Sequence, residues 1–191
     1  MINETTLIQR MSSPVMAAIT ATKITASALA LLASVSLTAL AGSDNRAPEV
    51  PDEIAVDLSA NKVQLHGFGV GFQVYTWDGS TWTGPVPDAL LFGNGGNIVA
   101  THFEGPSWQS TSGSLVVGTV TGKVTPDLTA IPWVRLVPVS TEGPGIFADV
   151  TFIQRINTVG GKAPETDGTE IGQVAKVPYT ADYFFYRASQ N

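Results

Sequence analysis

From Glu53 to the C-terminus, short apolar runs alternate with turn-forming residues, and this alternation restricts the possible folds more than any other feature of the sequence. The runs are rich in Val, Ile, Thr and aromatic residues, and none follows a helical period long enough to predict a helix. A parallel α/β fold is excluded because its strands need crossover helices of about a dozen residues. The sequence therefore predicts an all-β domain over residues 53–191, a single antiparallel β-barrel or β-sandwich.

Nine runs are predicted to be strands, and turn-forming residues separate them. Asp78-Gly79 and Gly93-Asn94-Gly95-Gly96 favour tight hairpin turns in which glycine adopts a positive φ. The predicted strands are Lys62–His66, Val70–Trp77, Ala89–Phe92, Asn97–Phe103, Leu115–Val120, Trp133–Val139, Ile146–Asn157, Val174–Val177 and Tyr183–Arg187.

Strand alternation predicts which side chains of the run after Ile146 face the core. The more apolar face holds Ala148, Val150, Phe152, Gln154 and Ile156, and the other holds Asp149, Thr151, Ile153, Arg155 and Asn157. We therefore expect Gln154 to point into the core, with hydrogen-bond partners there, and Arg155 to point away from it. The alternative for Gln154 is a polar group that lines an internal ligand cavity.

The N-terminal segment has the pattern of a secretory signal peptide. The eighteen residues Ile24–Ala41 carry no charge, follow Arg10 and Lys23, and end in the small-x-small site Ala39-Leu40-Ala41. Residues 1–41 are predicted to be a signal peptide cleaved before Gly42, which makes the protein secreted, extracellular or periplasmic. Several Ser and Thr weaken the apolar run, so no stable membrane span is expected after cleavage. The alternative is an N-terminal anchor that stays uncleaved.

Residues 42–52 contain two prolines among polar residues and are predicted to be a linker. The absence of cysteine excludes disulfides, thiolate metal sites and a thiol nucleophile. The net charge is −6 and the basic residues are scattered, so no nucleic-acid partner is expected.

His102 and Glu104 are the first candidate site residues, because residues two apart on a strand share one face. An imidazole and a carboxylate can bind a divalent cation, but a metal site needs three or four ligands. The only other histidine is His66. We therefore predict no metal site, and the alternative to a binding role is two polar residues on a solvated face.

Trp82 and Trp108 are candidates of a second kind, because both stand beside turn residues. Exposed aromatic rings on a sheet can stack on a sugar or an apolar ligand, although large aromatic side chains more often fill the core. These two are the expected surface pair among the four tryptophans.

Two glycine clusters invite comparison with a dinucleotide site. Such a site needs G-x-G-x-x-G at a strand-to-helix turn, where backbone amides meet the pyrophosphate. Gly67-Phe68-Gly69-Val70-Gly71 has another spacing, and both it and Gly93-Asn94-Gly95-Gly96 are followed by strand patterns. We interpret both as turns, and expect neither a nicotinamide-dependent dehydrogenase nor any cofactor. A G-x-S-x-G nucleophile elbow is also absent.

Four longer segments carry a family resemblance: GVGFQVYT (69–76), THFEGPSW (101–108), VTFIQRINTVGGKAP (150–164) and PYTADYFFY (178–186). Together they resemble the secreted bacterial and fungal family called domain of unknown function 3455. The resemblance implies export and a single domain, and it supplies no catalytic residues. Relatives often have Cys at the position of Trp77 and near Asp167, and both are missing here.

Two classes of function follow from these features. The favoured one is a non-enzymatic, exported binding or surface-associated module whose partner is a small molecule, a glycan or a surface component. The alternative is a small secreted hydrolase or lyase that uses a polar cleft on the β-scaffold. A filled core with a flat aromatic patch favours the first, and a cleft that holds His102, Glu104 and a third polar group favours the second.

Overall fold

The computed structural model describes residues 47–189. The predicted signal peptide, its cleavage site and the start of the predicted linker lie outside the described residues. Within them, no helix is long and apolar enough to cross a membrane.

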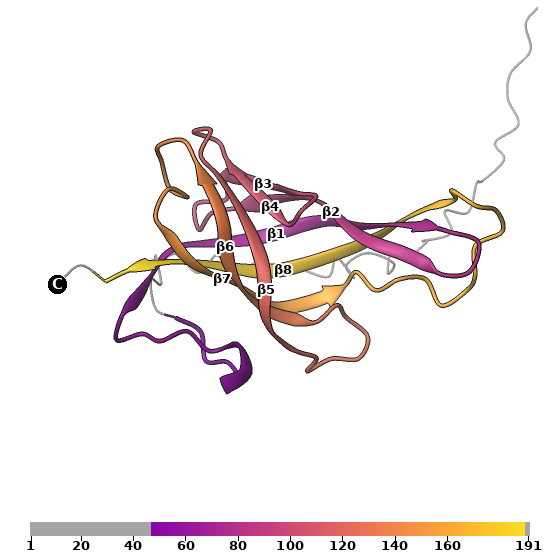
Figure 1. The fold of residues 1–191 in the computed structure, drawn as a ribbon, viewed down its shortest axis with the longest axis horizontal. Coiled ribbons are helices and arrows are strands. Elements are labelled where there is room, and N and C mark those ends of the chain that lie inside the picture. The colour runs from indigo at the N-terminus through magenta and orange to yellow at the C-terminus, as the bar shows by residue number, and fades with distance from the viewer. Residues whose placement is uncertain (1–46, 190–191) are drawn as a thin grey trace, which may run out of the picture. The chain divides into compact units, whose positions relative to one another are not determined.

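Eight antiparallel strands form a closed barrel in which each strand pairs with its neighbours in chain order (Figure 1). The all-β prediction is thus confirmed, as a barrel. A short 3-10 helix, η1 (Asp52–Ile54), precedes the strands. The strands are β1 (Asn61–Trp77), β2 (Trp82–Phe92), β3 (Ile98–Phe103), β4 (Ser107–Ser110), β5 (Leu115–Val124), β6 (Trp133–Glu142), β7 (Val150–Gly160) and β8 (Val174–Ala188).

The barrel closes along β1 and β8, which pair from Asn61 and Ala188 to Thr76 and Val174. The sequence predicted each of them as two strands, and the cluster Gly67-Phe68-Gly69-Val70-Gly71 as a turn. That interpretation is wrong, because the cluster lies within β1. Glycine is required within this part of β1 because a side chain would clash with its neighbours: a Cβ on Gly69 would lie 2.6 Å from the ring of Tyr183. The second cluster, Gly93-Asn94-Gly95-Gly96, does form the β2–β3 turn.

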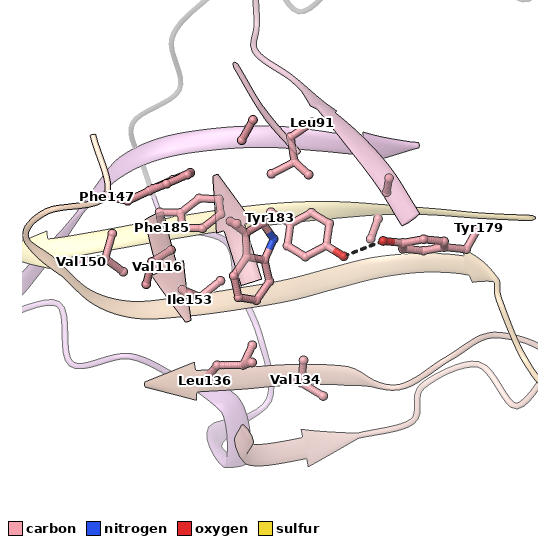
Figure 2. Close-up of a cluster of buried hydrophobic side chains, with 14 of the residues drawn as sticks. Leu91, Val116, Val134, Leu136, Phe147, Val150, Ile153, Tyr179, Tyr183 and Phe185 are labelled. Carbon is pink, nitrogen blue, oxygen red and sulfur yellow. Dashed lines mark hydrogen bonds between the residues drawn. The ribbon is translucent and has the colours of Figure 1, made fainter. Parts of the chain in front are cut away.

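Most of the core fills the barrel interior (Figure 2). Its large side chains are aromatic, and Trp108 packs edge-on against Tyr183 and Phe185. The buried members of this interior cluster are Ala89, Leu91, Ala100, Trp108, Val116, Ile131, Val134, Leu136, Phe147, Val150, Ile153, Tyr179, Ala181, Tyr183 and Phe185.

A second, smaller cluster includes η1 and the chain around it. Its buried members are Ile54, Val63, Ile156, Phe184 and Tyr186, and Ala47 and Val50 pack against them. Hydrogen bonds fasten this segment to the strands: Gln154 Nε2 donates to the carbonyl of Ile54 at 2.7 Å, and Arg135 Nη1 donates to that of Ala55 at 2.6 Å. Both faces of β7 are therefore buried, one toward the barrel interior and one toward this segment.

This arrangement corrects the predicted faces of β7. Gln154 is buried with internal partners, as predicted. However, the register of β7 against β8 shifts between Val150 and Phe152, so Val150 and Ile153 both belong to the interior cluster. Arg155 pairs with Val134 and Tyr183, two interior residues, and faces the barrel interior. The prediction that Arg155 points away from the core is wrong for another reason: Phe152, Gln154 and Ile156 do share one face, but that face packs on the η1 segment, and the opposite face, with Ile153 and Arg155, is the one that lines the barrel interior.

Candidate ligand-binding site

A cavity of about 410 Å³ lies at the end of the barrel where β1 and β3 finish and β2 begins. Polar side chains reach it from three different strands and one adjoining turn. Its lining residues are Gln73, Pro85, Val86, Pro87, His102, Glu104, Gly105, Pro106 and Arg155. The volume falls within the range of about 300–1,000 Å³ that is typical of small-molecule sites.

His102 is buried in one wall of this cavity, with 2% of its surface exposed. Its ring stacks on Trp108, with 4.3 Å between centroids. Nδ1 lies 2.8 Å from the carbonyl oxygen of Ser107. Because a carbonyl only accepts, Nδ1 donates this bond and Nε2 is left as the acceptor nitrogen.

Burial, which desolvates the imidazolium, lowers the pKa of His102 to about 3. The bond to Ser107 opposes this shift and the charge of Arg155 adds to it. His102 is therefore neutral at physiological pH.

Arg155 brings a positive charge to the same cavity from β7. Its Nη2 donates to the carbonyl of Pro132 at 2.9 Å, whereas its buried Nε has no hydrogen-bond partner. None of the salt bridges between residues 47 and 189 includes Arg155. A guanidinium is charged at every physiological pH. Among residues 47–189, no carboxylate forms a salt bridge with this half-buried cation.

Gln73 brings a second unpaired donor. The side chain is 1% exposed, and its buried Nε2 has no hydrogen-bond partner. Leaving a buried amide donor unpaired costs about 1–3 kcal/mol. The hydroxyl of Tyr179 lies close enough for the Gln73 amide to lower the pKa of that phenol, but no hydrogen bond of normal geometry forms, so Gln73 presents a polar group that the protein does not fully satisfy.

Tyrosine hydroxyls continue the polar region into the barrel. The hydroxyls of Tyr179 and Tyr183 point toward each other (Figure 2) and lie 3.1 Å apart. Tyr75 donates to the carbonyl of Gly161 at 2.7 Å. Burial raises the pKa of all three phenols, and the neighbouring Tyr183 raises that of Tyr179 further. The hydroxyls are therefore uncharged, and the charge of Arg155 acts on all three phenols.

The five candidate residues do not form one site. The cavity receives His102 and also Glu104, which lies exposed in the turn after β3. Trp108 is only 1% exposed and lies behind His102, so its expected surface position is wrong: β4 is a short strand whose alternate residues point inward. Trp82 is half-buried elsewhere, where Nε1 donates to the carbonyl of Thr166. Gln154 belongs to the η1 side of β7.

Sequence reasoning missed Gln73 and Arg155. Alternation along β1 would have found Gln73, because it shares the inward face with Tyr75 and Trp77. No comparable pattern indicates Arg155, since the more apolar face of β7, with Phe152 and Ile156, packs on the η1 segment and not in the barrel interior. Among the described residues, no group of three or more His, Asp or Glu is placed to hold a metal ion.

The four sequence segments that carry the family resemblance meet at this polar region. The first contributes Gln73, the second His102 and Glu104, the third Arg155, and the fourth the tyrosine pair. Comparisons with curated proteins and with solved structures give no match. The family model described as protein of unknown function (DUF3455) matches residues 58–187, which include every strand but the last residue of β8. The chain belongs to the DUF3455 family.

Proposed function

We propose that this protein is an exported binding module that holds a small polar molecule in the cavity at the end of its barrel. The observation that carries the proposal is the unpaired Nε2 of Gln73, a buried donor that lines a cavity of ligand size. Buried polar groups in native proteins are nearly always paired, so an exception beside a cavity calls for an explanation. A bound molecule that accepts a hydrogen bond there supplies one.

Export remains part of the proposal and rests on the sequence alone. The uncharged run Ile24–Ala41 and the small residues that end it support a cleaved leader. A binding module outside the cytoplasm would meet small molecules and glycans of the medium or the cell surface.

A hydrolase or lyase is the second candidate, and one observation favours it: the cavity brings His102 and Glu104 together with a third polar group, Arg155. Two others favour binding. The pKa of about 3 makes His102 a weak proton acceptor, far from the range suited to a general base near neutral pH. The described residues that line the cavity also include no hydroxyl, thiol or amine side chain as a nucleophile.

The surface offers a further feature of a binding module. Phe68, Val70 and Phe72 are each at least 40% exposed on the outward face of β1. The structure thus contains both the exposed aromatic face expected of a binding module and the polar cleft expected of a hydrolase or lyase. The choice therefore depends on the chemistry of the cleft, which supports binding.

Substitution of Gln73 by Leu tests the proposal, because it removes the unpaired amide at similar size. We expect the variant to lose binding of small polar molecules while its free energy of unfolding stays equal or rises by about 1 kcal/mol. Ligand-observed NMR with a mixture of sugars, sugar acids and amino acids measures binding, and urea denaturation measures stability.

Gln109→Leu is the matched control, because Gln109 is exposed on β4 and outside the cavity. It should leave binding unchanged. The same NMR spectra separate the two candidates: ligand signals that persist unaltered support binding, and new product signals support an enzyme. A Gln73→Leu protein that is clearly less stable and binds the mixture as before would contradict the proposal.

A further inference from the structure

We propose that the molecule held in the cavity is a small hydroxy acid with one carboxylate, which Arg155 receives. This inference rests on the proposed function and names its ligand class.

The interior end of the cavity is positive. Arg155 is half-buried there without a carboxylate partner among the described residues, while the histidine and tyrosines around it are neutral. A cation kept from bulk water favours an anion more strongly than an exposed one does, because the surrounding dielectric is lower. The charge that complements this site is therefore negative.

The unpaired donors match the two oxygens of a carboxylate. Arg155 interacts with the hydroxyl of Tyr183 and Gln73 with that of Tyr179. The buried Arg155 Nε and Gln73 Nε2 nevertheless make no hydrogen bond of normal geometry, and both residues line the same cavity. Arginine holds carboxylates through two parallel N–H···O bonds, which a neutral ligand oxygen matches less well. One carboxylate would thus satisfy groups that are orphaned in the free protein.

His102, which lines the same cavity, offers an acceptor. His102 donates through Nδ1 to Ser107, so its Nε2 accepts, and only a ligand group that donates, such as a hydroxyl, can pair with it. Glu104 adds a negative charge at the exposed rim. One half-buried cation against one acidic rim residue suits a singly charged ligand better than a phosphate or a dicarboxylate.

Titration calorimetry with the matched probes glucuronate and glucose tests this inference on the purified protein. The two sugars share most of their hydroxyls, and only glucuronate carries a carboxylate. We expect glucuronate to bind about ten- to a hundredfold more tightly than glucose, the range that a charge-assisted hydrogen bond supports. Arg155→Gln should abolish that preference.

Two further variants keep the result interpretable. Arg155→Lys retains the charge without the planar fork, so it should keep a reduced preference for glucuronate even if Arg155→Gln fails to fold. Lys123→Gln removes a positive charge from an exposed position of β5 and should leave the preference unchanged.

Equal binding of glucose and glucuronate, or a preference that survives in Arg155→Gln, overturns the inference and leaves the proposed function standing. If only the uncharged members of the NMR mixture bind, the inference of a carboxylate ligand is likewise overturned and the proposed binding function stands. Absence of binding for both probes and for every molecule of that mixture overturns the proposed function as well.

Discussion

Substitution of His102 by Phe should remove most of the acid sensitivity of folding between pH 7 and pH 5. The histidine is buried against Trp108 and its pKa in the folded protein is about 3, below the ordinary value of 6.5. Phenylalanine keeps a flat ring on the tryptophan and cannot take up a proton. The comparison therefore isolates the titration of one side chain.

The sign of the effect follows from proton uptake. Between pH 6.5 and pH 3 the unfolded chain binds a proton at His102 that the folded protein does not bind, so acid favours unfolding. A full proton changes the free energy of unfolding by about 1.4 kcal/mol per pH unit. For a pKa that moves from 6.5 to about 3, the stability lost between pH 7 and pH 5 is about 2 kcal/mol.

Urea denaturation at the two pH values, followed by circular dichroism, measures this loss. Wild type should lose about 2 kcal/mol more than His102→Phe between pH 7 and pH 5. The variant also loses the bond to Ser107, but that cost is the same at both pH values and cancels in the comparison. His66→Phe, which changes the other histidine, should still show the loss due to His102. An equal loss in wild type and His102→Phe would refute a neutral, desolvated imidazole at this position.

Three other predictions concern separate parts of the account. Gln154→Leu should destabilise the fold by about 1–3 kcal/mol in urea and leave ligand binding unchanged, because the amide bonds Ile54 and Tyr186 on the η1 side of β7; loss of binding at full stability would contradict this. Intact-mass analysis of the culture supernatant should show a chain that starts at Gly42, whereas a retained leader would argue against export. Calorimetric titration with NAD or NADP should give no heat beyond dilution, and micromolar binding would contradict our conclusion that neither glycine cluster is a dinucleotide site.

Local patterns in the sequence predicted the β-class and most strands, because the preference of a segment for a strand or a turn is set by residues a few positions apart. The pairing of strands depends on distant contacts, and there the predictions were weaker. The glycines of β1 illustrate this: they are a turn signal locally, yet in the barrel Gly71 allows Asp88 and Ala89 of β2 to approach, since a Cβ would lie 2.2 Å from the carbonyl oxygen of Asp88.

The candidate site was predicted in part for the same reason. His102 and Glu104 were found from alternation along a single strand, which needs no knowledge of the partner strands. Arg155 was expected to point away from the core because its face of β7 carries fewer apolar side chains, yet that face lines the barrel interior with Ile153, while the more apolar face packs on the η1 segment. Trp108 was predicted to lie at the surface because Gly105 and Pro106 before it suggest a turn. However, the four residues after Pro106, Ser107–Ser110, form β4, and Trp108 points inward from that strand.

The most direct test of the account is the NMR signal of the Arg155 Nε–H group during titration with glucuronate. Assigned by its loss in Arg155→Lys, this signal should shift progressively with glucuronate and stay unchanged with glucose, because only a carboxylate gives the unpaired Nε–H a charged acceptor. Arg135, which is bonded to Ala55 outside the cavity, provides a reference that should not move. An Arg155 signal that stays fixed while glucuronate shifts other resonances of the barrel would contradict the account.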